Sequence, residues 1–199
     1  MHLPDGLVSA PLAGAGLTVS AILTVWAARS LRADELPRLS MVTSALFVGS
    51  LFHIPLMGTS VHFTLVGLAG ILLGRRSFLS VAVAVLFQFV FFRHGGLAVW
   101  GLNTLHMGLG ALAGAYAFAR FRGLGLRWAP FAAGWVSAVV KVGAFSGTLL
   151  LADFPAAAAA TVLVAHGPVI ALEGLLIGLV VSGLQRAKAG DIIDASKNR

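Results

Sequence analysis

Long apolar stretches separated by short polar loops fill nearly the whole chain of 199 residues. A run of about 20 apolar residues is long enough to cross a bilayer as a helix. The pattern predicts seven such segments, at residues 7–28, 40–56, 61–74, 77–92, 97–119, 128–152 and 159–184. The third is short, and a turn-like stretch from Pro55 to Ser60 joins it to the second. We therefore expect an all-α, polytopic transmembrane helix bundle that forms a single domain over residues 1–199.

The composition also indicates a membrane protein. Charged residues make up 11% of the chain and hydrophobic residues 58%, whereas a soluble domain carries about 25% charged residues. The chain has no cysteine, which excludes disulfides, thiolate metal sites and iron–sulfur clusters. The net charge of +7 does not indicate nucleic-acid binding, because the basic residues lie in short loops between apolar segments. The first residues lack the features of a removable signal peptide, and we expect none.

The distribution of Lys and Arg predicts the orientation in the membrane. Twelve of them follow the first, third, fifth and seventh segments, whereas Arg93 alone lies in the loops on the other side. Short loops rich in Lys and Arg stay in the cytoplasm. We therefore expect the N-terminus outside and the C-terminus in the cytoplasm, with the chain in the cell (inner) membrane.

Met1 and His2 together have the chemistry of a metal chelate. A free Met1 amine, the amide nitrogen of His2 and its imidazole can form two fused rings around one ion, and they leave one corner of a square open. Square-planar nitrogen sites suit Ni(II) and Cu(II), and low-spin Co(II) can also adopt them. We expect Met1 to be retained, because the aminopeptidase that removes it needs a small second residue. The alternative is that His2 follows the initiator by chance.

The predicted orientation places His62 on the same side as this chelate, because the turn that precedes it faces outward. A single imidazole from His62 would close the square. All six histidines fall in the outer half of the predicted bundle. For four of them, an interfacial or hydrogen-bonded structural role is the simpler interpretation; these are His53, His94, His106 and His166.

Lys141 and Glu173 fall near the middle of the sixth and seventh segments. A lone charge at that depth costs about 2.5–3.5 kcal/mol, and such residues usually face the bundle interior and pair. We therefore predict an ion pair between them. It would either fix the register of the two helices or take part in a relay for metal or protons.

Three catalytic signatures are absent from the sequence. It contains no Gly-rich P-loop, so we do not expect the chain to hydrolyse ATP itself. It contains no His-Glu-x-x-His metalloprotease motif and no Gly-x-Ser-x-Gly nucleophile elbow. We therefore expect a non-enzymatic protein.

Several short motifs, distributed over nearly the whole chain, match one pattern. They are Met1-His2-Leu3-Pro4-Asp5-Gly6, Gly58-Thr59-Ser60-Val61-His62, residues 67–74, His94-Gly95-Gly96-Leu97, Gly101-Leu102-Asn103, Met107-Gly108, His166-Gly167-Pro168 and Glu173-Gly174. Together they resemble the CbiM/NikM family, the substrate-binding membrane subunits of energy-coupling-factor transporters for cobalt and nickel. The N-terminal motif is the most specific, because few membrane proteins need their own first residue as a ligand.

The resemblance implies a metal site made by Met1, His2 and His62, the same atoms that the chelate chemistry selects. It also implies that Asn103 orients these ligands without touching the metal, and we expect Ser60 and His53 to act in the same way. Two positions depart from the family pattern, Val61 and the pair Leu56-Met57. They leave the conformation of the turn and the choice of metal open.

The transported substrate implied by the resemblance is Co²⁺ or Ni²⁺. Its partners would be a transmembrane coupling subunit, two cytoplasmic ATPase subunits that energise uptake, and a small accessory membrane subunit. The Pro4-Asp5 form of the opening is closer to the cobalt branch. Cu(II) should bind more tightly than either ion in vitro, so affinity alone does not identify the physiological metal.

Two other interpretations of the sequence give the same histidines different roles. His106 and His166 would be the axial ligands in a bis-histidine haem membrane cytochrome. In a purely structural helix bundle, all six histidines would be incidental.

Overall fold

The computed structural model describes residues 2–51, 53–56, 59–125 and 128–187, with the two strands given by their backbone alone. The helices are α1 (Ala10–Ala28), α2 (Leu36–Gly49), α3 (Val66–Leu73), α4 (Ser77–Phe92), α5 (Trp100–Phe121), α6 (Trp128–Leu151) and α7 (Ala156–Arg186). Short 3-10 turns lie at Ala33–Glu35, Gly74–Arg76 and Arg122–Leu124. The two strands are β1 (His53–Leu56) and β2 (Thr59–His62).

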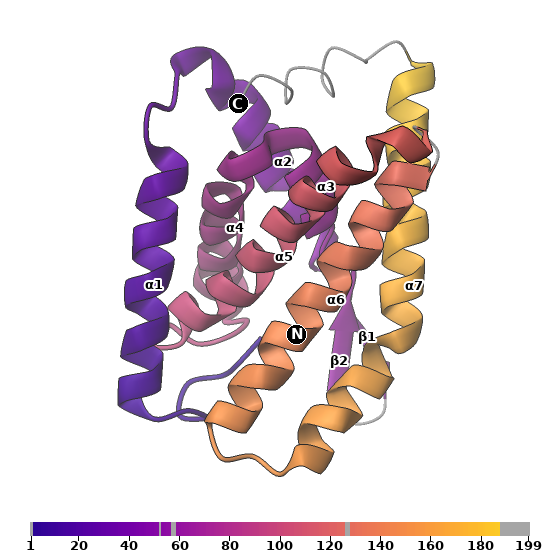
Figure 1. The fold of residues 1–199 in the computed structure, drawn as a ribbon. Helices are drawn as coiled ribbons and strands as arrows, with labels where there is room; N and C mark the ends of the chain where they lie inside the picture. Colours follow the sequence, from indigo (N-terminus) through magenta and orange to yellow (C-terminus); the bar gives the residue numbers. More distant parts are fainter. Residues whose placement is uncertain (1, 52, 57–58, 126–127, 188–199) are drawn as a thin grey trace.

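The central element is α5, which packs against α1, α3, α4 and α6. Helix α7 packs on the far side of α6 and also against β2 (Figure 1). We call the lower end of the bundle in Figure 1 the hairpin end; it includes the loops at residues 93–99 and 152–155. The opposite end, where α1, α5 and α7 finish, is the arginine end. The helices thus place the motif-bearing loops at one end.

The all-α membrane class is confirmed, although the number of crossings differs from the seven predicted. Four segments are long and apolar enough to span a membrane: Ala10–Ala28, Val66–Phe92, Trp128–Leu151 and Ala156–Arg186. The second of these combines α3 and α4. Helix α2 has 14 residues and α3 has 8, fewer than the about 20 that a crossing needs. The chain is therefore a multi-pass membrane protein in which some segments only partly traverse the bundle.

The predicted segments 40–56 and 61–74 are wrong in their boundaries, because a β-hairpin replaces the facing ends of both. Helix α2 already ends at Gly49 and α3 begins only at Val66. Between them, β1 and β2 pair antiparallel, with His53 opposite His62. Pro55 has no backbone N–H for a helix, and β-branched residues such as Val61 favour strands. The middle of the predicted turn, residues 57–58, lies outside the described residues.

Small residues allow the closest helix contacts. A methyl group added at Gly134 would lie 2.9 Å from Cα of Gly174, so α6 and α7 touch almost backbone to backbone there. A methyl group at Gly114 would lie 3.1 Å from Cα of Gly67, which brings α3 against α5 in the same way. Glycine at such crossings is the usual solution in membranes, where close van der Waals packing drives helix association.

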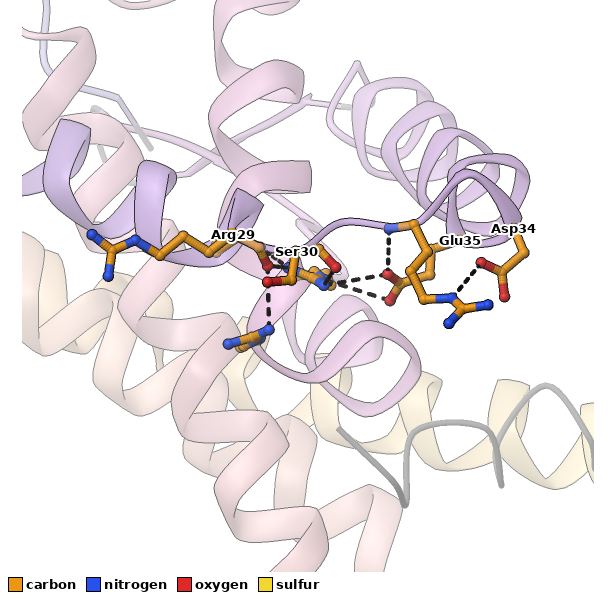
Figure 2. Close-up of polar contacts among 8 residues, drawn as sticks. Arg29, Ser30, Asp34 and Glu35 are labelled. Atoms are coloured by element: carbon orange, nitrogen blue, oxygen red, sulfur yellow. Dashed lines mark hydrogen bonds and ion pairs between the residues drawn. The ribbon is translucent and has the colours of Figure 1, made fainter.

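At the arginine end, the buried guanidinium of Arg76 binds the end of α1 and the 3-10 turn before α2. Figure 2 shows Arg29, Ser30, Asp34 and Glu35 in this region. It donates to the carbonyl oxygens of Ala27 at 2.6 Å, Arg29 at 2.5 Å and Ser30 at 2.9 Å. It also pairs with Glu35, 3.2 Å from Nη2 to Oε2. The last carbonyls of a helix have no partner within the helix, so Arg76 satisfies groups that burial would otherwise leave unpaired.

Candidate metal-binding site

The N-terminal segment runs into the bundle from the hairpin end rather than across its surface (Figure 1). Leu3 is fully buried, at 0% exposed. It belongs to an apolar cluster with Val99 and Leu102 at the start of α5 and with Phe145 and Leu149 near the end of α6. Burial of one leucine side chain contributes about 1.5–3 kcal/mol, so this contact anchors the segment beside His2.

Asn103 fixes the backbone of the same residue. Its Oδ1 accepts a hydrogen bond from Leu3 N at 2.8 Å, and its Nδ2 donates to Leu3 O at 3.0 Å. The side chain is 2% exposed. The side-chain oxygen and nitrogen of Asn103 therefore both bind the backbone of Leu3, and the peptide that follows His2 has a single defined orientation. Asn103 therefore fixes the backbone next to His2, and its role in orienting metal ligands stays a prediction.

Asp5 holds the segment from the other side. Its carboxylate accepts hydrogen bonds from the backbone N–H groups of Leu97 at 3.0 Å, Ala98 at 2.9 Å and Val99 at 3.3 Å, just before α5 begins. A carboxylate is favourable at this position because the first N–H groups of a helix lack partners and carry partial positive charge. A methyl group at Gly96 would collide with the Asp5 carboxylate, so this glycine permits the contact.

His2 lies beside His94, with ring centroids 4.4 Å apart and the planes at 73°. Gly95, the next residue, has φ +83°, a conformation that favours glycine, and a methyl group added there would meet His2 and Asn103. His94 also lines a cavity of about 280 Å³ with Ser50 and Gln88. The loop after α4 therefore lies beside His2, although sequence analysis had assigned its histidine, His94, only a structural role.

The remaining predicted ligands are only partly described. Met1 lies outside the described residues, as do the side chains of His53, Ser60 and His62. The backbone shows that His62 ends β2 opposite His53, and β2 packs against α7. Among the described residues, no three His, Asp or Glu side chains gather closely enough to hold a metal. The ligand set thus remains a prediction.

Directly after β2, a buried polar network holds the chain. Glu173 Oε1 accepts hydrogen bonds from Thr64 Oγ1 at 2.6 Å, Thr64 N at 3.2 Å and Leu65 N at 3.0 Å. Its Oε2 pairs with Lys141 Nζ at 2.8 Å, and Lys141 also donates to Thr64 Oγ1 at 2.7 Å. Glu173 is 1% exposed. The predicted Lys141–Glu173 ion pair is present, and its two side chains hydrogen-bond to Thr64 and Leu65, shortly after His62.

Leu65 has φ +55°, in the left-handed region, and it is the residue from which α3 starts. That conformation is unfavourable for a side chain larger than glycine and persists only where the surroundings fix it. The Glu173 carboxylate does so by accepting the Leu65 N–H. The exit from β2 is therefore constrained by α6 and α7 rather than by its own sequence.

The two histidines of the haem alternative lie on different helices, and both make protein contacts. His106 Nε2 lies 2.7 Å from Thr148 Oγ1, and its ring packs against Phe145 with centroids 5.5 Å apart. His166 Nδ1 lies 2.8 Å from Val162 O. The ring nitrogen that His106 would offer to haem iron is thus used by Thr148, so the structure does not favour the cytochrome interpretation.

Sequence analysis missed the roles of Asp5, Thr64 and Leu65. For Asp5 a signal was present, since it belongs to the specific motif of residues 1–6, but its partners are more than 90 positions away. For Thr64 and Leu65 no local signal exists, because their bonds to Glu173 depend on how α7 packs.

The chain is similar to several metal transport proteins. A putative metal transport protein of Haemophilus influenzae is 38% identical over 120 residues, which cover 59% of this chain and 57% of that protein. The fused nickel transport protein NikMN of Rhodobacter capsulatus is 34% identical over 137 residues, 65% of this chain and 38% of that protein. The cobalt transport protein CbiM of Sorangium cellulosum is 32% identical over 171 residues, 79% and 76% of the two chains. The chain thus spans only about half the length of the first two relatives.

The fold also has a solved counterpart. A crystal structure of a transition metal transporter aligns with a TM-score of 0.80 at 20% sequence identity, covering 100% of this chain and 99% of that one. At this identity the likeness concerns the fold alone. Residues 2–190 match the family model for the cobalt uptake substrate-specific transmembrane region, named CbiM. Because this match covers nearly the whole sequence, the chain belongs to the CbiM family of cobalt and nickel transport proteins.

Proposed function

We propose that the chain is the substrate-specific membrane subunit of an energy-coupling-factor importer, which binds Co²⁺ or Ni²⁺ at its outer face. In this proposal Met1, His2 and His62 supply the four nitrogens of a planar site. The hairpin end faces outward and the arginine end faces the cytoplasm of the inner membrane. Residues 1–199 act as one metal-binding domain.

The observation that carries the proposal is the anchoring of the N-terminal segment. Leu3 is buried, Asn103 binds both of its backbone groups, and Asp5 caps α5. These contacts hold the chain next to His2 in one place against α5. A chelate whose ligands include the first amine needs this kind of support, because a free chain end loses conformational freedom when it binds.

The chemistry of the site predicts how binding responds to pH. An amine must be neutral and an amide nitrogen must lose its proton before either coordinates the metal. Binding therefore releases protons, and affinity should rise with pH. Cu(II) should bind more tightly than Ni(II) or Co(II), so the transported ion is set by availability and by the partners rather than by affinity alone.

Energy would come from partners: a transmembrane coupling subunit, two cytoplasmic ATPase subunits and a small accessory membrane subunit. The sequence supports this requirement, since it contains no P-loop. The arginine end offers short loops for contacts with these partners.

Uptake of radioactive cobalt or nickel by cells that lack other importers tests the function. We expect uptake only when the chain is expressed with the coupling and ATPase subunits. Adding two residues before Met1 should abolish uptake, whereas adding the same residues at the C-terminus should not. Uptake without active ATPase subunits, or equal uptake by both extended forms, would contradict the proposal.

A further inference from the structure

His166 is a buried imidazole whose hydrogen-bonding state can be assigned. Its Nδ1 lies 2.8 Å from the carbonyl oxygen of Val162. A carbonyl oxygen only accepts hydrogen bonds, so Nδ1 must carry the proton. In the neutral ring, Nε2 then has a free lone pair. Metal-bound histidines usually donate their other ring N–H to a backbone carbonyl in this way, which fixes the tautomer and the ring orientation.

The Nε2 atom of His166 has no hydrogen-bond partner among the described residues, although the side chain is only 2% exposed. A buried acceptor left without a partner is destabilising. His106, the other deeply buried histidine, differs in this respect because its Nε2 contacts Thr148 at 2.7 Å. Of these two buried histidines, His166 alone combines a fixed tautomer with a ring nitrogen that no described residue contacts.

The position of His166 along α7 places it toward the strand that ends at the predicted ligand His62. His166 precedes Glu173 by two helical turns, on the same buried side of α7. This spacing corresponds to about 10 Å along the helix. Glu173 binds Thr64 and Leu65, and the backbone of His62 precedes Thr64 by about 7 Å along an extended chain. Both steps lead toward the hairpin end (Figure 1), and α7 packs against β2.

The N-terminal segment approaches the same turn of α7. Val162, whose carbonyl orients the His166 ring, packs against the apolar cluster that contains Leu3. Helix α7 thus contacts the apolar cluster of the N-terminal segment one turn before His166, and it also packs against β2. No other described helix brings a buried histidine with an unused nitrogen to this place.

We propose that Nε2 of His166 is an additional ligand of the transported Co²⁺ or Ni²⁺ ion, bound from above or below the plane of the N-terminal chelate. The proposal rests on the planar site, whose four corners are already filled by Met1, His2 and His62. A further nitrogen can then reach the ion only along the axis. Such a ligand would favour Co(II), which readily binds a fifth nitrogen, over planar four-coordinate Ni(II).

Electron paramagnetic resonance of the Co(II)-loaded protein tests this directly. In low-spin planar Co(II) the unpaired electron points along the axis, so an axial nitrogen splits the cobalt lines through its nuclear spin. We expect this splitting in the native protein and its loss in His166→Ala, together with an about 10- to 100-fold lower Co(II) affinity. The matched control is His106→Ala, which removes an equally buried imidazole and should keep both the splitting and the affinity.

The outcomes separate this proposal from the planar chelate. If the native protein binds Co(II) tightly without axial nitrogen splitting, His166 is not a ligand, whatever the stability of the variant, and the planar chelate stands. The same conclusion follows if His166→Ala keeps the splitting. If the native protein binds neither Co(II) nor Ni(II), the planar site itself is wrong and this inference falls with it.

Discussion

Two buried ion pairs stand out among the described residues, Lys141–Glu173 beside the hairpin and Arg76–Glu35 at the arginine end. In both, the charged groups also bind backbone atoms. Arg76 donates to carbonyls at the end of α1, whereas Glu173 accepts from N–H groups at the start of α3. The sign of each charge matches the free backbone groups of the helix end that it serves.

The two pairs differ in the residues that lie next to the helix ends they bind. The arginine-end pair connects the end of α1, the 3-10 turn before α2 and the turn before α4 (Figure 2), and the groups that Arg76 binds there belong to no described residue of the predicted metal site. The Lys141–Glu173 pair holds Thr64 and Leu65, the residues that follow His62. The first pair should therefore affect stability alone, and the second should affect both stability and the metal site.

The largest effect is expected for Glu173→Leu. This change leaves Lys141 buried without its carboxylate, which typically costs about 3–5 kcal/mol, and it releases the exit from β2. We expect a strongly lowered melting temperature in detergent and loss of tight Ni(II) binding in calorimetric titration.

The double variant Lys141→Met/Glu173→Leu provides the control. Replacing both partners of a buried pair by apolar residues often restores stability, but it does not restore the hydrogen bonds to Thr64 and Leu65. Recovered melting temperature with weak metal binding would support a positioning role. Full recovery of both would show that the pair only fixes helix register.

Arg76→Met should destabilise the fold by about 3 kcal/mol, because it leaves Glu35 buried and three carbonyls without their donor. The folded fraction should bind Ni(II) with native affinity. Thermal melting and titration of the same preparation check both points. Reduced affinity in folded protein would show that the two ends of the bundle are coupled.

Asn103→Ala should have an intermediate effect, since it leaves the N–H and C=O of Leu3 unsatisfied at a cost of about 1–3 kcal/mol. We expect an about 10- to 100-fold loss of Ni(II) affinity through misplacement of His2. Ser20→Ala is the matched control: it removes the 2.8 Å bond from Ser20 Oγ to Gly101 O, also buried in α5 packing. Equal losses of affinity in the two variants would remove the special role of Asn103.

The smallest effect is expected for Asp34→Ala. Asp34 forms an exposed pair with Arg32 at 3.0 Å, and this hydrogen bond raises the pKa of the Arg32 guanidinium. Exposed pairs contribute little because water and salt screen them. Neither the melting temperature nor metal affinity should change, and a clear change in either would mean that this exposed pair takes part in packing after all.

The comparison also shows what the sequence could reveal. Lys141 and Glu173 were paired correctly because isolated charges in apolar segments need each other. The hairpin was missed because the predicted segments continued to residue 56 and resumed at residue 61, on either side of the predicted turn, whereas the chain there forms two short paired strands. Asn103 and Asp5 stood in recognisable motifs, yet the backbone groups that they bind come from segments about 90 to 100 positions away.

The most direct test of the account is titration of the purified protein with Ni(II), followed by d–d absorbance, for the native chain and for a form with two residues added before Met1. A form with the same residues at the C-terminus serves as control. We expect the N-terminal extension to abolish tight binding and the square-planar band, while the control behaves as native. Equal binding by all three forms would contradict the chelate and with it the proposed mode of metal capture.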